Sequence, residues 1–312
     1  MKPLIETKDL SVDYRIGSKK LRAVDSISLS IAPGETLGLV GESGCGKSTL
    51  GKAILRLVEP TSGQIYFDGE EITRLKEKRL KREMQMIFQD PLASLNPRMS
   101  VGEIIKEPLV VHNMPYEMDD IYRRLDLVGL PRLSTGRYPH EFSGGQRQRI
   151  GIARALALHP RFLVCDEPIS ALDISIQAQI VNLLQELQQE LKLTYLFIAH
   201  DLSMVRYLST HVAVMYLGRF VEIGPSEGLY KNPLHPYTQL LLNSVPLLDP
   251  IKERKRKPIL LSGEIPSPLN PPPGCAFSSR CPLATDLCRK KRPELQADRE
   301  GRLVACHHHR QF

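Results

Sequence analysis

The stretch Gly41-Glu42-Ser43-Gly44-Cys45-Gly46-Lys47-Ser48-Thr49 matches the pattern G-x-x-x-x-G-K-[ST]. A short apolar run of strand type, residues 36–40, precedes it, and residues 50–57 follow it with helical spacing. This strand–loop–helix context is the one in which the pattern binds phosphates. Inward-turned backbone N–H groups and the start of the helix favour an anion there. The stretch therefore predicts a nucleoside triphosphate site in an α/β protein.

Two residues of this loop have separate predicted roles. Lys47 is expected to reach the β- and γ-phosphates, and Ser48 is expected to hold Mg²⁺. Small residues elsewhere in the loop let the backbone approach the ligand closely. The remaining predicted ATP contacts in the loop are Gly41, Ser43, Gly44, Cys45, Gly46 and Thr49.

A second apolar run, residues 161–165, ends in two acids. Such a run is typical of a strand buried in a parallel sheet. Asp166 at its end is expected to reach Mg²⁺, and Glu167 is expected to polarise the attacking water. The alternative is a buried strand followed by a solvated acidic turn, which leaves the spacing to the other motifs unexplained.

Further elements follow in a definite order along the chain. Gln89 ends one strand-like run and His200 ends another, while Ser143-Gly144-Gly145-Gln146 precedes a helix-like run. A helix start preceded by glycines is suited to binding a phosphate. Together with Ser170-Ala171-Leu172-Asp173, this order resembles the ATP-binding subunits of ABC transporters. The resemblance covers about residues 4–230.

The resemblance implies a role for each of these residues. Gln89 would couple Mg²⁺ and the γ-phosphate to the membrane subunit, and His200 would contact the γ-phosphate and the attacking water. Asp173 would act across a dimer interface, and Tyr14 would stack on adenine. The stretch Phe142 to Gln146 corresponds to the signature motif of the family. This motif usually begins with leucine, and Phe142 replaces that leucine with another apolar residue. The γ-phosphate of the opposite subunit would be bound by Ser143, Gly144, Gly145 and Gln146.

The overall composition is that of a folded soluble protein, with 42% hydrophobic and 25% charged residues among 312. No run is long enough to span a membrane, and the start carries no secretory signal. We therefore expect a cytosolic chain that meets a membrane through a partner. The net charge of +7 concentrates at residues 74–82 and 252–257. Neither run carries interleaved aromatics, which favours a solvated face or anionic lipid headgroups over nucleic acid.

Strands that alternate with helices predict a mainly parallel sheet, the P-loop NTPase class of α/β fold. Residues 1–230 are expected to form the nucleotide-binding domain, with a helical subdomain at about residues 91–155. A helix with one apolar face is expected at Ile174–Leu191. The character changes near residue 231, and a proline-dense stretch at residues 265–273 follows. These features predict an irregular C-terminal extension over residues 231–312.

Four of the six cysteines cluster in this extension, namely Cys275, Cys281, Cys288 and Cys306. Disulfides fit poorly with a reducing compartment. Four thiolates suit structural Zn²⁺, but zinc ligands usually come in close C-x(2–4)-C pairs, which are absent here. Iron–sulfur clusters also take four thiolates and tolerate varied spacing. The spacing alone therefore leaves zinc and an iron–sulfur cluster equally open.

Residues 262–268 and 274–282 resemble the C-terminal extension of dipeptide and oligopeptide importer ATPases. Members of that group can carry a [4Fe–4S] cluster on these cysteines, which favours the cluster over zinc. The resemblance implies an ATP-hydrolysing subunit that powers peptide uptake, bound peripherally at the cytoplasmic face of the inner membrane. The implied partners are a second, different ATPase subunit, two permease subunits and an external peptide-binding protein.

Two alternatives to the peptide importer are left open by the sequence. The same ATPase role could serve a nickel importer or an importer of another solute, because selectivity resides in other subunits. A non-transport ABC ATPase acting on ribosomes or DNA is the second alternative. Ribosomal types carry two nucleotide domains and repair types carry a long coiled coil, whereas this chain has one phosphate loop and no long heptad run.

Overall fold

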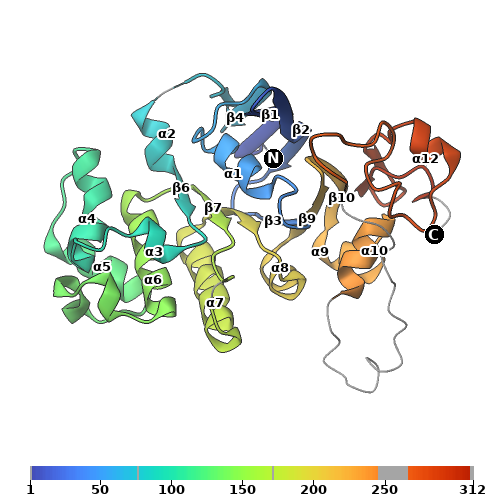
Figure 1. Ribbon diagram of the computed structural model, residues 1–312. Coiled ribbons are helices and arrows are strands. Elements are labelled where there is room, and N and C mark those ends of the chain that lie inside the picture. The colour runs from blue at the N-terminus through green and yellow to red at the C-terminus, as the bar shows by residue number, and fades with distance from the viewer. Residues whose placement is uncertain (1, 76, 171, 245–265, 310–312) are drawn as a thin grey trace, which may run out of the picture. The chain divides into compact units, whose positions relative to one another are not determined.

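The computed structural model describes four segments of the chain: residues 2–75, 77–170, 172–244 and 266–309. It divides into two compact units, and Figure 1 labels most of their helices and strands. Of the described residues, the first unit comprises 2–5, 30–36 and 66–199, and the second unit comprises the others. The basic run at residues 252–257 lies outside the described segments.

A parallel sheet forms the centre of the first unit. β6 (Met84–Ile87), β7 (Phe162–Asp166) and β8 (Thr194–Ile198) pair side by side, with Phe162 opposite Thr194. Every residue of β7 and β8 is buried, which is the environment that continuous apolar runs indicate. The expected α/β class with parallel strands is therefore confirmed.

The helix expected after the two acids has the predicted bounds. α7 (Ile174–Leu191) buries one face, made of Ile180, Val181, Leu183, Leu184 and Leu187. Gln188 donates from Nε2 to the backbone oxygen of Gly34 at 2.9 Å and to Oγ1 of Thr36 at 2.8 Å. Ile176, which the pattern also places on the apolar face, is only half-buried. The amphipathic pattern thus identifies the buried face correctly except at its N-terminal end.

Helices dominate residues 91–158 of the first unit. They are α3 (Pro91–Ser94), α4 (Val101–Val111), α5 (Met118–Leu127), the 3₁₀ turns η1 (Arg132–Gly136) and η2 (Pro139–Glu141), α6 (Gly144–Ala155) and η3 (Leu156–Leu158). α4 begins at a capping box in which the Glu103 carboxylate accepts from the N–H of Ser100 at 2.8 Å. Arg124 of α5 donates to the carbonyl of Ala157 at 2.7 Å, which joins α5 to η3.

The basic run at residues 74–82 overlaps α2 (Lys78–Glu83). Half of the Arg79 side chain in this run is exposed, at 52%. It forms ion pairs with three acids: Glu70, Glu77 and Glu83. Neighbouring acids therefore neutralise part of the charge of this run.

The second unit is built on a mixed sheet. β3 (Thr36–Val40), which leads into the phosphate loop, pairs in parallel with β9 (His211–Tyr216). β10 (Arg219–Pro225) pairs antiparallel with β9. The sheet continues through β12 (Leu303–Val304) to β11 (Gln296–Ala297), both antiparallel to their neighbours. The last strands of the chain therefore belong to the sheet that holds the start of the phosphate loop.

A buried arginine also ties the extension to the preceding part of the chain. The Arg302 side chain is 4% exposed and pairs with Asp298 at 3.0 Å. Its Nη1 donates to the carbonyls of Gly228 and Asn232, the latter at 2.7 Å. The sequence suggests a boundary near residue 231, but these bonds and the β10–β12 pairing make the extension continuous with the second unit.

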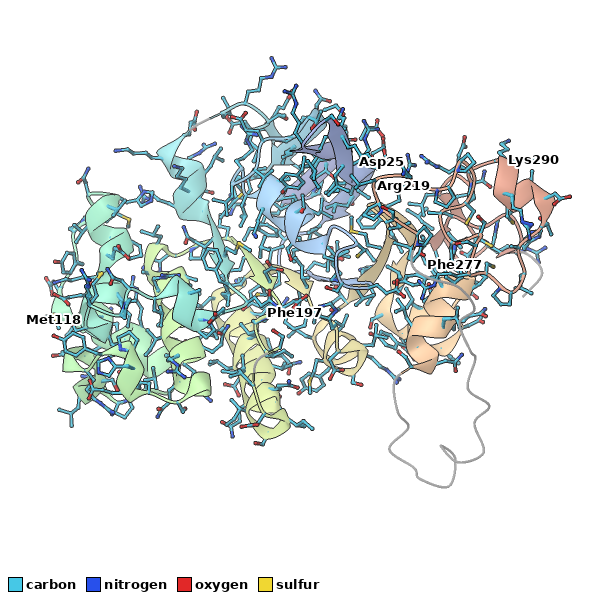
Figure 2. All side chains as sticks on the ribbon, viewed as in Figure 1. Asp25, Met118, Phe197, Arg219, Phe277 and Lys290 are labelled. Atoms are coloured by element: carbon cyan, nitrogen blue, oxygen red, sulfur yellow. The ribbon has the colours of Figure 1, made fainter. Side chains whose placement is uncertain are left out.

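A second sheet has the strand order β2-β1-β4-β5. Its strands are β1 (Ile5–Ile16), β2 (Lys19–Ile31), β4 (Ser62–Phe67) and β5 (Glu70–Glu71). Most residues of β1, β2 and β4 belong to the second unit. Within that unit, Arg219 of β10 donates from Nε to Oδ2 of Asp25 in β2 at 2.6 Å (Figure 2). This charged bond joins the second sheet to the mixed sheet.

Short helices complete the second unit. They are α1 (Lys47–Ile54), α8 (Leu202–Leu208), α9 (Ser226–Lys231), α10 (Pro236–Asn243) and α12 (Asp286–Lys290). In the part of the chain that the structure describes, no helix is both long enough and apolar enough to cross a membrane.

Candidate functional site

The predicted phosphate loop joins β3 to α1 in the second unit. Gly46, at the start of α1, has a φ of 109°, in the left-handed region that favours glycine. A Cβ atom there would lie 2.1 Å from the backbone oxygen of Ala23, so any larger residue would displace the backbone. No side chain caps the first turn of α1. A helix that begins in this way offers its first N–H groups and its dipole to an anion.

Lys47, the predicted phosphate-binding lysine, is buried within this loop. Its Nζ donates to two carbonyl acceptors, Gly41 at 2.8 Å and Glu42 at 3.0 Å, and also lies 3.9 Å from Sγ of Cys45. Only 4% of the residue is exposed. Because both acceptors are neutral, these bonds hold the ammonium group in place without neutralising its charge. A buried positive charge of this kind favours the binding of an anion such as a phosphate group.

A residue that the sequence reading missed also holds the loop. Arg280 donates to both carboxylate oxygens of Glu42 at 2.9 Å, and these bonds raise the pKa of Arg280 above its ordinary value. Nη1 of Arg280 also donates to the hydroxyl of Tyr216 at 3.3 Å. Glu42 occupies a variable position of the loop pattern, and no local pattern marks Arg280. The sequence therefore contains no signal for this pair.

Two predicted catalytic residues meet in the first unit. Gln89 donates from Nε2 to Oε2 of Glu167 at 2.7 Å, although 78 residues separate them. Glu167 is buried and has a φ of 47°, a left-handed backbone that is uncommon outside glycine. The backbone N–H of Glu167 donates to the carbonyl of Ile198 at 2.9 Å. Asp166, the predicted Mg²⁺ ligand, is the last residue of β7 and is also buried.

The predicted signature residues form the beginning of α6. Ser143 is its N-cap, and its Oγ accepts from the N–H of Gln146 at 3.3 Å. In return, Oε1 of Gln146 accepts from the N–H of Ser143 at 3.0 Å, which completes a capping box. Both residues are exposed. The signature therefore has a local structural role and also lies on a solvent-accessible surface of the first unit.

The two glycines of the signature differ in their surroundings. A Cβ atom on Gly145 would lie 2.4 Å from Cγ2 of Ile176 on α7, which is closer than atoms can approach. A Cβ atom on Gly144 would lie 3.2 Å from Cδ2 of Leu172. Packing of α6 against α7 therefore explains Gly145 without any ligand. This packing also accounts for the half-burial of Ile176.

The remaining predicted ATP contacts lie on separate elements. Asp173 is the N-cap of α7 in the first unit, is exposed, and makes no side-chain cap hydrogen bond. Tyr14 lies in β1 in the second unit and is 37% exposed. His200 is the first residue of the second unit after β8. The roles of all three stay predictions.

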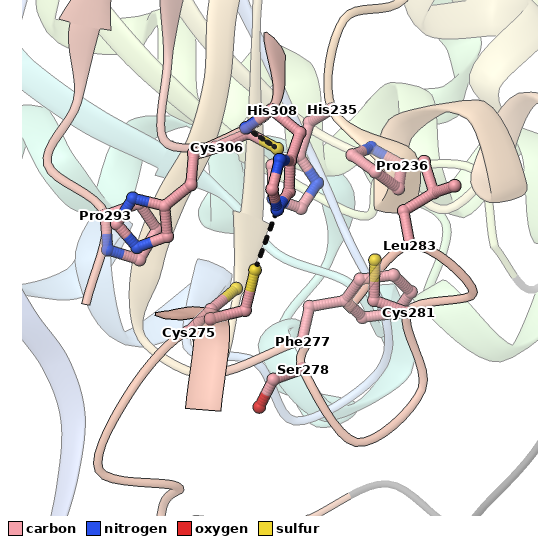
Figure 3. A pocket seen from close by; sticks show the side chains of 12 residues that line it. His235, Pro236, Cys275, Phe277, Ser278, Cys281, Leu283, Pro293, Cys306 and His308 are labelled. Atoms are coloured by element: carbon pink, nitrogen blue, oxygen red, sulfur yellow. Dashed lines mark hydrogen bonds between the residues drawn. The ribbon is translucent and has the colours of Figure 1, made fainter. Parts of the chain in front are cut away.

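The four clustered cysteines line one small pocket of the second unit, shown in Figure 3. All four are free thiols. Sγ of Cys288 lies 3.4 Å from Nε2 of His308, and Sγ of Cys306 accepts from the backbone N–H of His308 at 3.4 Å. The lining also includes His235, Pro236, Phe277, Leu283, Pro293 and His307. Residues separated by 31 positions are thus gathered around a common space, from Cys275 to Cys306.

Burial raises the pKa of three of these thiols. It raises the pKa of Cys275 to about 11, and the charges of the other three thiolates act in the same direction. Burial likewise raises the pKa of Cys281 and Cys306. Metal binding there must release protons, because thiolates are the ligating form. Among the described residues, no set of three or more His, Cys, Asp or Glu side chains has the spacing to hold a single metal ion.

Comparison with known proteins gives two family matches. The ABC transporter family matches residues 24–170, and the oligopeptide/dipeptide transporter C-terminal region matches residues 221–288. The chain is 55% identical to a putative oligopeptide transport ATP-binding protein, YkfD, of Bacillus subtilis, over 99% of this chain and 96% of the relative. It is 51% identical to the oligopeptide transport ATP-binding protein OppF of Salmonella typhimurium, over 95% of this chain and 93% of the relative.

Solved structures resemble a large part of the chain. The ATP-binding cassette MJ0796, in a dimeric post-hydrolysis state bound to ADP and Pi, matches with a TM-score of 0.65 and 27% identity, over 71% of this chain and 98% of its own. The cbiO1 protein of Clostridium perfringens, part of the ABC transporter complex cbiONQ, matches with a TM-score of 0.67 and 29% identity. The latter match covers 74% of this chain and 92% of the solved chain.

Proposed function

Because this chain belongs to the ATP-binding proteins of oligopeptide ABC transporters, we propose that it hydrolyses ATP to power peptide import through partner permease subunits. The observation that carries this function is the similarity to oligopeptide transport proteins along nearly the whole chain, including the C-terminal region. In this proposal the phosphate loop binds ATP, and the Gln89–Glu167 pair carries out its hydrolysis.

ATP binding begins at the phosphate loop. The uncompensated ammonium of Lys47 takes the β- and γ-phosphates, and the N-terminus of α1 stabilises their negative charge. The hydroxyl of Ser48 and the carboxylate of Asp166 are oxygen donors of the kind that Mg²⁺ prefers. When bound, Mg²⁺ neutralises charge on the phosphates. Tyr14 stacks on the adenine ring in this proposal.

Hydrolysis depends on the pair formed by Gln89 and Glu167. The Gln89 amide donates to Oε2 of Glu167 at 2.7 Å and orients this carboxylate, which accepts a proton from the attacking water. His200 contacts the same water and the γ-phosphate. Gln89 lies just before the helical residues 91–158. A shift of the Glu167 carboxylate during hydrolysis therefore reaches those helices through the Gln89 side chain.

The signature residues Ser143 to Gln146 bind the γ-phosphate of an ATP molecule held by a second ATPase subunit. Ser143 and Gln146 are exposed at the N-terminus of α6, where a helix dipole favours a phosphate. Asp173, exposed at the start of α7, meets the same partner. We assign this partner to a different ATPase chain, so that two unlike subunits close around ATP. The assembly lies at the cytoplasmic face of the inner membrane and takes peptides from an external binding protein.

Peptide import is tested by deleting the gene for this chain in its host and measuring uptake of labelled dipeptides and oligopeptides. Uptake is expected to be lost and to return with the wild-type gene, but not with Glu167→Gln. Uptake of labelled nickel serves as the matched control and should be unchanged. Loss of nickel uptake with intact peptide uptake would make the chain a nickel importer subunit. Intact uptake of both would exclude these transport roles.

The cysteine pocket is proposed to hold a [4Fe–4S] cluster. Four free cysteines around one pocket are the ligand set of such a cluster. A tetrahedral zinc ion would require four sulfurs about 3.8 Å apart, since each Zn–S bond is about 2.3 Å. Among the described residues, no group of three or more His, Cys, Asp or Glu side chains is placed to hold a metal ion, so the choice of a cluster rests on the four-cysteine ligand set and on the resemblance of residues 274–282 to the family's extension. The cluster would hold together segments of the extension that are distant in sequence.

Iron and sulfide analysis of protein purified without air tests this proposal. We expect about four iron and four sulfide per chain, a brown colour, and loss of both elements in Cys275→Ser. Cys165→Ser is the matched control, because Cys165 is buried in β7 and lies outside the pocket. Stoichiometric zinc without iron would show that the pocket is a zinc site and would refute the cluster. Protein without either metal, yet well folded, would refute both.

A further inference from the structure

The ion pair between Arg280 and Glu42 joins two parts of the chain with different chemistry. Glu42 is the second residue of the phosphate loop, and Arg280 lies between two cysteines of the pocket. Their contact is bidentate, with both N–O distances at 2.9 Å, across 238 residues of sequence. The Arg280 side chain is 5% exposed, so solvent screens this pair far less than a surface ion pair.

Aromatic side chains surround the pair and hold the backbone of the loop. The hydroxyl of Tyr237 accepts from the N–H of Glu42 at 2.9 Å. Tyr237 packs on Tyr216 with ring centroids 4.6 Å apart, and both rings contact Phe277 of the extension, at 5.3 and 5.4 Å. Both the side chain and the backbone of Glu42 are therefore held by groups that pack against the extension.

The segment from Cys275 to Cys281 is a compact series of turns. The N–H of Ser278 donates to the carbonyl of Cys275 at 3.0 Å, and the N–H of Arg280 donates to the carbonyl of Phe277 at 3.0 Å. Cys275 is itself fixed by donating to the carbonyl of Cys288 at 2.7 Å. The backbone of Arg280 is therefore held within the short segment that carries Cys275 and Cys281.

We propose that Arg280 is a positioning residue for the phosphate loop, and that through Glu42 it makes the affinity for ATP depend on the cysteine pocket. It does so in two ways. It fixes the conformation of the loop residue whose carbonyl also accepts from Lys47 at 3.0 Å. It also neutralises the Glu42 carboxylate, which would otherwise repel the phosphates of ATP. The inference rests on the proposed ATP-binding function of this loop.

Binding of a non-hydrolysable ATP analogue with Mg²⁺ to the purified full-length chain tests the proposal. Arg280→Gln is expected to weaken binding about tenfold, within the range typical of coupling between two sites. In ATPase assays KM for ATP should rise while kcat stays near the wild-type value, because Glu167 and Gln89 are untouched. Arg280→Lys should recover part of the affinity, since it restores the charge but not the bidentate geometry.

A second substitution separates positioning from general loss of stability. Glu42→Gln added to Arg280→Gln removes the unpaired carboxylate and should restore most of the lost affinity. Arg302→Gln is the matched control, because Arg302 is an equally buried arginine of the extension that binds Asp298 rather than the loop. It should lower the melting temperature and leave KM unchanged. Equal effects of Arg280→Gln and Arg302→Gln on KM would overturn the positioning role.

The link to the cysteine pocket has its own readout. Cys281→Ser should weaken analogue binding in the wild-type chain but add little in the Arg280→Gln chain, because both changes act through one contact. Fully additive effects would overturn the link. Absence of analogue binding to the wild-type chain would instead refute the ATP-binding function, so the two failures are distinguishable.

Discussion

Glu167→Gln is expected to lower the rate of ATP hydrolysis about a thousandfold, within the range attributed to a positioned general base. The substituted amide has nearly the same shape but cannot accept a proton from water. A thousandfold loss corresponds to about 4 kcal/mol of transition-state stabilisation. Phosphate release from the purified full-length chain measures the loss. ATP should stay bound, because the phosphate loop is unchanged, and retention of labelled ATP after gel filtration measures that.

The structure supplies a control for this prediction. Glu186 lies on α7, is exposed, and carries the same carboxylate, so Glu186→Gln should leave the rate unchanged. The left-handed backbone of Glu167, with a φ of 47°, makes the shape of the substituent important, and glutamine preserves that shape. Brisk hydrolysis by Glu167→Gln would refute its assignment as the base. The melting temperature of the variant shows whether a lower rate reflects a loss of folding.

Patterns confined to short stretches of sequence allowed much of the fold to be predicted. β7 and β8 are continuous apolar runs, and α7 has the expected bounds, because period and burial are local properties of the chain. The phosphate loop is also local, since its glycines, lysine and flanking elements lie within a few residues of each other. Each of these features follows from residues that are neighbours in both sequence and space.

Contacts between distant residues could not be predicted in this way. The Arg280–Glu42 pair spans 238 residues, and either residue alone reads as an ordinary surface charge. The pairing of β12 with β10 was missed because a strand of two residues, Leu303–Val304, is too short to show a period. Gly145 differs from these examples, because the sequence did mark it as a functional residue. A ligand role and packing against Ile176 both require glycine there, so the sequence pattern alone does not distinguish the two reasons.

Lys47→Ala is expected to weaken ATP binding by about two to three orders of magnitude. Hydrogen bonds to charged groups contribute about 1.5–3 kcal/mol each. At the lower end of that range, loss of the contacts to two phosphates removes roughly 3–4 kcal/mol, at about 1.4 kcal/mol per tenfold change in affinity. The bonds from Nζ to the carbonyls of Gly41 and Glu42 are lost as well, which loosens the loop. Calorimetric titration with ATP and Mg²⁺ measures the change.

A lysine on the same helix separates this role from general charge effects. Lys52 lies near the end of α1 and is half-buried, so Lys52→Ala removes one positive charge from the helix while the loop stays intact. ATP affinity should change little, because a charge at the C-terminal end of the helix is more than a turn away from the anion site. Equal losses from both substitutions would mean that net charge, and not the buried ammonium of Lys47, attracts ATP. A large loss confined to Lys47→Ala, with an unchanged melting temperature, would assign the phosphate contact to Lys47 itself.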